Sequence, residues 1–188
     1  MTKSQTNNPA FTLLKKDHDK VKDLFDQFEK AKGLAAKKKI VDQALLELEV
    51  HAAIEEELFY PTIRKAVGKE DMNEADEEHH VAKILISELS EMNGDEEHYS
   101  AKFTVLSENV RHHIGEEESQ LFSKAHDAKI DFDALCAAMQ KRKEDLLANG
   151  VPLAAESVMV AASHGKGDSP AQASENANPQ SARKFWKK

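Results

Sequence analysis

The sequence predicts an all-α fold: an up-down-up-down four-helix bundle with a short fifth helix and a disordered C-terminal tail. Glycine and proline are sparse, at 7 and 5 of 188 residues, and aromatic residues make up only 6%, a composition that favours helix over sheet. Apolar residues recur at alternating steps of three and four along four long segments, as expected of helices that pack against neighbours. The pattern also repeats, because His79 follows His18 by 61 residues and His113 follows His51 by 62.

The repeat indicates two helical hairpins related by a pseudo-two-fold axis, and short connections make neighbouring helices antiparallel. The first predicted helix begins near Phe11 and ends at a turn around Gly33. The second carries its apolar stripe from Val41 to Leu58, and Pro61 is expected to bend or end it.

A linker is expected at residues 68–71, before the third helix, whose stripe runs from Met72 to Leu89. Asn93 and Gly94 form a strong turn signal, and the fourth stripe follows from Phe103 to Leu121. A shorter fifth helix is predicted over residues 131–148. Residues 1–8 are expected to form a flexible arm, residues 9–149 the helical domain and residues 150–188 a disordered tail of low hydrophobicity.

The composition also restricts function and setting. The formal net charge of −8 argues against a nucleic-acid partner, and no apolar run approaches the ~20 residues of a membrane helix. The single cysteine, Cys136, excludes an internal disulfide and a cysteine-based metal site. The polar N-terminus lacks the apolar core of a signal peptide, so a reducing, cytoplasmic location is the expected setting.

One histidine stands in each of the four apolar stripes, where a buried imidazole is costly unless it is paired or bound to metal. The four are His18, His51, His79 and His113. Glu55 and Glu117 follow His51 and His113 by four residues, about one helical turn, so each pair points the same way. The helical phase places His80 and His112 outside, and the remaining glutamates of the two EEE runs are expected to be mostly solvated.

These six inward residues predict a binuclear metal site, since imidazole with carboxylate suits iron, zinc or manganese. Four histidines and two carboxylates are too many for one tetrahedral zinc and too few to saturate two octahedral ions. Bridging by Glu55 and Glu117, with open positions for solvent or a small ligand, reconciles the count. Tyr60 is expected mainly to pack, although it could line the site.

Four segments together resemble the hemerythrin-like, or HHE cation-binding, domain family over about residues 11–125. The segments are LKKDHDKVKDLF, HAAIEEELFYP, EEHHVAKILISEL and HHIGEEESQLF. The resemblance implies a four-helix bundle that holds two non-haem iron ions with an oxo or hydroxo bridge, with manganese or zinc as substitutes. It also implies six ligands: His18, His51, Glu55, His79, His113 and Glu117.

The chain departs from the oxygen-carrying hemerythrins at two positions. Lys83 stands where they have a second third-helix histidine, and Glu117 lies four residues after His113, where they have an aspartate at five. These differences argue against dedicated oxygen transport. We therefore expect a di-iron protein that binds or senses dioxygen, nitric oxide or peroxide, with no protein partner identifiable.

Two alternatives remain at this point. One is a di-iron enzyme that decomposes peroxide or oxidises ferrous iron, although the sequence shows no additional acid–base residue that requires it. The other is a metal-free helical interaction module, which would leave six inward polar residues unsatisfied and is disfavoured for that reason.

Overall fold

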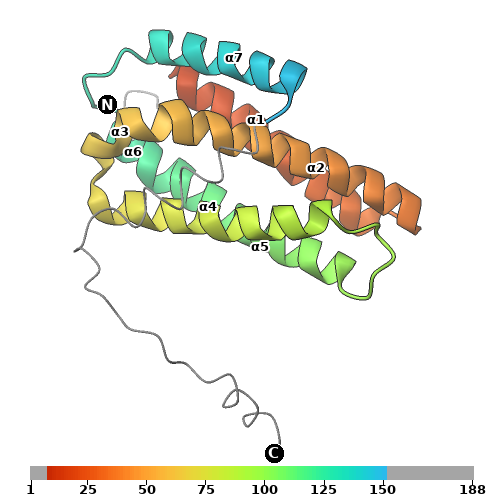
Figure 1. The fold of residues 1–188 in the computed structure, drawn as a ribbon. Helices are drawn as coiled ribbons and strands as arrows, with labels where there is room; N and C mark the ends of the chain where they lie inside the picture. The colour runs from red at the N-terminus through yellow and green to blue at the C-terminus, as the bar shows by residue number, and fades with distance from the viewer. Residues whose placement is uncertain (1–7, 152–188) are drawn as a thin grey trace, which may run out of the picture. The chain divides into compact units, whose positions relative to one another are not determined.

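The structure, a computed structural model, describes residues 8–151 (Figure 1). The predicted arm and tail lie outside the described residues, apart from residue 8 and residues 150–151. The described part is helical and contains no strand, which confirms the predicted all-α class. In chain order its elements are α1 (Pro9–Lys30), α2 (Leu34–Ile54), η2 (Glu55–Phe59), α3 (Tyr60–Val67), α4 (Lys69–Ser90), α5 (Tyr99–Glu116), η3 (Glu117–Leu121), α6 (Phe122–Ala125) and α7 (Phe132–Asn149).

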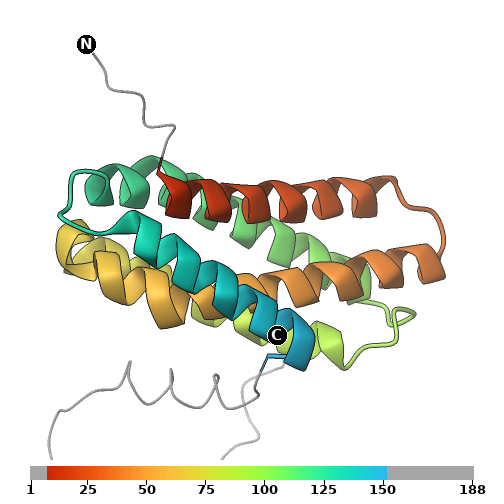
Figure 2. The same ribbon diagram turned by 90° about the horizontal axis from the view of Figure 1, so that it is seen from above.

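Two helical hairpins build the bundle, one formed by α1 and α2 and the other by α4 and α5 (Figures 1 and 2). Asn8 begins the first hairpin, because its side-chain oxygen accepts hydrogen bonds from the backbone N–H groups of Ala10 and Phe11. Asn8 is thus the cap of α1 rather than part of an arm. The predicted fifth helix is α7, capped by Asp131, and it packs across the outside of α1 and α2.

The helix that follows the first turn does not end at Pro61. It continues as α2, η2 and α3 to Val67, so Pro61 does not end the helix. The π-helical turn η2 lies directly before Pro61, and its last hydrogen bond runs from the Tyr60 N–H to the Glu55 carbonyl. Proline is tolerated in the first turn after such a break in the α-helical ladder, because its missing N–H is not needed there. The expected linker at 68–71 likewise reduces to Gly68, since α4 begins at Lys69.

The buried apolar side chains form two clusters along the bundle. One gathers around Phe11, Phe59 and Phe122 and includes the residues that α7 contributes. The other gathers around Phe25 and Phe103 in the opposite half of the bundle. The four inward histidines and two glutamates belong to neither cluster, so a polar layer separates the two apolar cores. Within residues 8–151, no helix has both the length and the apolar character needed to cross a membrane.

Candidate metal centre

The six residues singled out by their helical phase all point into the bundle. The histidines are 1% to 7% exposed, and Glu55 and Glu117 are 0% exposed. His80 and His112, the second members of the two HH pairs, are exposed, as their phase predicted. The structure therefore brings together all six predicted site residues, while their role as metal ligands remains a prediction.

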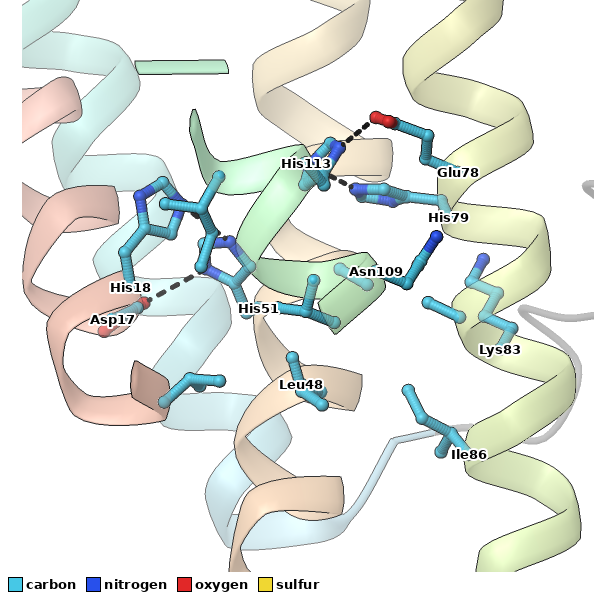
Figure 3. Close-up of a pocket in the computed structure, with 15 residues that line it drawn as sticks. Asp17, His18, Leu48, His51, Glu78, His79, Lys83, Ile86, Asn109 and His113 are labelled. Atoms are coloured by element: carbon cyan, nitrogen blue, oxygen red, sulfur yellow. Dashed lines mark hydrogen bonds and ion pairs between the residues drawn. The ribbon is translucent and has the colours of Figure 1, made fainter. Parts of the chain in front are cut away.

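The six residues form two adjacent groups of donor atoms. Figure 3 shows the four histidines as two pairs, His18 with His51 and His79 with His113. In the first group, the Nε2 atoms of His18 and His51 lie 3.2 Å apart. A Glu117 oxygen lies 3.1 Å from His18 Nε2, and a Glu55 oxygen lies 3.1 Å from His51 Nε2. One ion surrounded by these four side chains would have two nitrogen and two oxygen ligands.

The second group contains His79 and His113, whose Nε2 atoms lie 3.1 Å apart. The second oxygen of Glu55 lies 3.4 Å from His79 Nε2, so Glu55 directs one oxygen to each group. A carboxylate placed in this way can bridge two cations. Each hairpin therefore supplies the histidine pair of one group, while Glu55 and Glu117 each extend toward the pair of the other hairpin.

A carboxylate also contacts the outer nitrogen of every histidine in the site. His18 Nδ1 lies 2.9 Å from Glu118, His79 Nδ1 lies 2.9 Å from Glu56, and His113 Nδ1 lies 2.8 Å from Glu78. His51 Nδ1 lies 3.6 Å from Asp17, a longer contact. Carboxylates at this position fix the ring orientation and favour the proton on Nδ1, which leaves Nε2 free to bind metal.

With neutral histidines and no metal, this arrangement leaves buried polar atoms without partners. If Nδ1 carries the proton, the Nε2 lone pairs of each histidine pair face one another at 3.1–3.2 Å. The four oxygens of Glu55 and Glu117 are buried and accept no hydrogen bond from any described residue. Convergent lone pairs and unpartnered carboxylate oxygens are what a divalent cation would satisfy, so the residues present fit a metal pair.

Tyr60 completes the second group. Its ring is 1% exposed, and its hydroxyl oxygen lies 3.1 Å from Nε2 of both His79 and His113. The hydroxyl can donate its proton to one of the two nitrogens only. Burial, together with the charges of Glu55 and Glu117, raises the pKa of Tyr60 well above its usual value. Tyr60 is therefore part of the site as well as of the packing.

The electrostatics of the site follow from burying two carboxylates side by side. Burial and the charge of Glu117 raise the pKa of Glu55 well above its ordinary value. Burial opposes ionisation of Glu117 too, but its contact with His18 outweighs this and lowers the pKa of Glu117. The pair therefore divides into one readily ionised and one reluctantly ionised carboxyl, as expected for like charges that share a site.

The two buried glutamates of the site, Glu55 and Glu117, each begin a π-helical turn. Glu55 is the first residue of η2 and Glu117 is the first residue of η3. Single π turns inside α-helices occur often at functional sites, where they reposition side chains. Here each widened turn begins at the glutamate of a histidine–glutamate pair and ends directly before an aromatic residue, Tyr60 in one helix and Phe122 in the other.

Sequence reasoning missed the carboxylates that contact the outer nitrogens. Glu56 and Glu118 were expected to be solvated, yet their side chains are only 6% and 26% exposed. The expectation was wrong for these two because a glutamate side chain is long enough to bend from the edge of the apolar stripe to the ring of a neighbouring helix. The sequence did contain one indication, because Glu56 and Glu118 directly follow the inward glutamates Glu55 and Glu117.

A cavity of about 40 Å³ adjoins the histidine pairs on the side of the Phe25 core (Figure 3). Its walls are largely apolar and include Leu48 and Ile86. Besides the four histidines, its polar lining consists of Asp17, Glu78, Lys83 and Asn109. The Asn109 side-chain oxygen is buried without a hydrogen-bond partner among the described residues. Since one water needs about 10–15 Å³ of cavity volume, the space suits a ligand of about two or three non-hydrogen atoms.

Comparisons with known proteins were made on the whole chain. The sequence model of the family described as "Hemerythrin HHE cation binding domain" matches residues 10–125, more than half of the 188 residues. A curated protein named DNA nickase, from Nostoc sp. (strain PCC 7120 / SAG 25.82 / UTEX 2576), is 27% identical over 111 residues, which cover 59% of this chain and 32% of that protein. The chain thus spans about a third of the length of this relative. No solved structure matches the chain.

Proposed function

Since the chain belongs to the hemerythrin HHE cation-binding domain family, we propose that it holds two non-haem iron ions and binds or senses a small oxygen or nitrogen species. His18 and His51 would hold one ion and His79 and His113 the other. Glu55 and Glu117 would complete both sets. The single observation that supports this most directly is the pairing of Nε2 atoms at 3.1–3.2 Å, with a carboxylate against the outer nitrogens.

The chain's own groups divide the remaining tasks. When bound, iron would supply the open coordination positions and the redox chemistry for dioxygen, nitric oxide or peroxide. The largely apolar cavity beside the histidine pairs has room for a ligand of that size. Tyr60 keeps its proton because its pKa is raised, so its hydroxyl can donate a hydrogen bond within the second group. Glu56 and Glu78 hold the rings of His79 and His113 in place.

The enzymatic alternative, peroxide decomposition or ferrous oxidation, uses the same centre and would appear as turnover rather than binding. The name of the Nostoc relative describes a protein about three times as long as the shared region, and the acidic charge of this chain gives no support for nucleic-acid binding. Nucleic acid is therefore not proposed as a partner.

The iron content of two variants, one at His79 and one at the neighbouring His80, tests the proposed centre. Protein purified without oxygen and loaded with ferrous iron should contain about two ions per chain. The H79A variant should lose at least one ion and unfold at lower temperature, because metal binding is linked to folding. H80A removes an exposed histidine one residue away and should retain both ions. Equal iron content in the two variants would refute the assignment.

Titration of the loaded protein distinguishes binding from catalysis. A new visible absorption that appears with dioxygen or nitric oxide and disappears when the gas is removed supports a binding or sensing role. Continuous consumption of added peroxide, with the initial spectrum restored after each addition, supports the enzymatic role instead. The Y60F variant, which keeps the buried ring, should shift the spectrum of the second group while leaving the iron count unchanged.

A further inference from the structure

A third group of ligand-type side chains lies at the surface, next to the buried centre. It consists of Glu78 on α4 and His112 and Glu116 on α5. His112 Nε2 lies 3.5 Å from a Glu78 oxygen and 3.6 Å from a Glu116 oxygen, with 64% of the His112 side chain exposed. One imidazole and two carboxylates at these distances can reach a single divalent cation from solvent.

Glu78 differs from the other carboxylates that orient the site histidines. Within residues 8–151, each of the others is paired with lysine: Glu118 with Lys15 and Lys22, Glu56 with Lys83, and Asp17 with Lys143. Glu78 has no lysine or arginine partner in that range. One Glu78 oxygen faces His112, and the other accepts a hydrogen bond from the Nδ1–H of His113 at 2.8 Å. One side chain therefore links the exposed group to the buried one.

A small acidic cavity continues from this group into the protein. Its volume is about 10 Å³, about the room that one water or one bare cation needs. Its lining includes Glu78, Glu116, His113 and Glu117. Glu117 is 0% exposed, and neither of its oxygens accepts a hydrogen bond from a described residue. The inner end of the acidic cavity is therefore an unpartnered buried carboxylate of the centre itself, which a cation on this route would reach first.

We propose that Glu78, His112 and Glu116 form a weak capture site for divalent transition-metal cations, which pass through the acidic cavity to Glu117 and His113. The proposal rests on the proposed function, because a capture site needs a buried centre to supply. Glu78 acts as the transfer group: it contacts the cation with the oxygen that faces His112 and then with the oxygen that faces His113. Carboxylates without neighbouring lysines also raise the local cation concentration.

Paramagnetic broadening tests the capture site directly, with Mn²⁺ as the probe. Substoichiometric Mn²⁺ added to protein already loaded with diamagnetic Zn²⁺ should broaden the ring-proton NMR signals of His112 and leave those of exposed His98, at the other end of α5, sharp. The H112A variant assigns the signal, and H112A is expected to fold because the side chain is mostly exposed. Equal broadening of His98 and His112, or none, would overturn the capture site.

Stopped-flow uptake of Co²⁺ by the metal-free protein tests the route. The H112A/E116Q variant should load about threefold to tenfold more slowly at low ionic strength, while its final count of tightly bound Co²⁺ stays unchanged. The matched control is H80A/E77Q, which removes the same groups from exposed positions of α4 and should load at the wild-type rate.

The outcomes separate the two proposals. Wild-type loading rates in H112A/E116Q would overturn the route while leaving the buried centre intact. Failure of the wild-type protein to bind any Co²⁺ tightly would overturn the proposed function and, with it, the route. In that case Mn²⁺ broadening at His112, measured on the metal-free protein, alone decides whether the exposed group binds a cation.

Discussion

Glu55 shows most clearly how a single residue can favour function over the stability of the metal-free fold. Its carboxylate is fully buried, lacks a hydrogen-bond partner among residues 8–151 and lies beside another carboxylate. We expect E55Q to raise the free energy of unfolding of the metal-free protein by about 1 kcal/mol, because it removes a buried carboxyl whose ionisation is opposed by burial and by Glu117. The same variant should lose bound iron. Chemical denaturation in chelator, together with metal analysis, measures both effects.

Glu57 provides the control for this prediction, since it lies on the same π turn but pairs with Arg142 at the surface. E57Q should change the free energy of unfolding by about 0.5 kcal/mol or less and keep both ions. A loss of stability in metal-free E55Q, in place of the expected gain, would show that Glu55 is a structural residue.

The outer carboxylates predict how stability depends on pH. Burial of Glu56 opposes its charged form, but contacts with His79 and Lys83 outweigh this and lower the pKa of Glu56 below the ordinary 4.5. The pKa of Glu118 is also lowered, chiefly by its hydrogen bond with His18. A lowered folded-state pKa means that this stabilisation is complete above pH 4.5 and is lost as pH falls further.

Metal-free protein should therefore lose stability between about pH 5 and about pH 3, and E56Q should lose about 1 kcal/mol less over that interval. Urea denaturation across the interval gives the values. E77Q, which alters an exposed glutamate, should follow the wild-type curve. The prediction fails if the E56Q and wild-type curves remain parallel.

Residue type and helical phase were enough to predict which histidines and glutamates point inward. An imidazole in a buried apolar stripe is costly unless it is paired or bound to metal, so its presence there indicates a polar site. Phase could not predict the role of Glu56, Glu78 or Glu118. It gives the direction in which a side chain leaves its helix, but not how far a flexible carboxylate bends back. Asp17 stands beside His18 in the sequence yet contacts His51, a pairing that only the tertiary arrangement determines.

At the scale of elements, helix positions followed the apolar pattern well, and the two π turns were the main feature it did not predict. A single π turn shifts the later residues by one position, which looks in sequence like ordinary variation between steps of three and four. Pro61 was therefore expected to bend or end a helix that in fact continues past it. Whether a turn is α or π is decided by which carbonyl the next N–H can reach, so it depends on packing around Glu55 and Glu117.

The junction between α3 and α4 offers a prediction about backbone conformation. Gly68 has φ of 105° and ψ of 164°, a region that residues with a side chain rarely adopt. G68A should cost about 1–3 kcal/mol, although no atom lies within 4 Å of the added Cβ. Gly115 lies inside α5 with equally open surroundings, so G115A should instead stabilise by about 0.5–1 kcal/mol. Thermal denaturation of both variants checks the opposite signs, and equal signs would contradict the argument.

At the scale of the whole molecule, α7 lies beyond the family match, which ends at residue 125, yet it belongs to the core. Met139 is 0% exposed and packs in the cluster around Phe59. M139A should lower the free energy of unfolding by about 2–4 kcal/mol without changing the iron count. L147A removes a side chain of α7 that is 48% exposed and should cost about 0.5 kcal/mol or less. Similar costs for the two variants would mean that α7 is only peripheral.

The way the two hairpins share their carboxylates has a further consequence for the loaded protein. Each histidine pair comes from one hairpin, but Glu55 of the first hairpin extends to the pair of the second, and Glu117 extends in the opposite direction. Neither hairpin by itself contains a complete ligand set for one ion. Bound ions would therefore link the two hairpins, so separation of the hairpins would require loss of ligands from both ions, and bound metal should slow unfolding of the bundle.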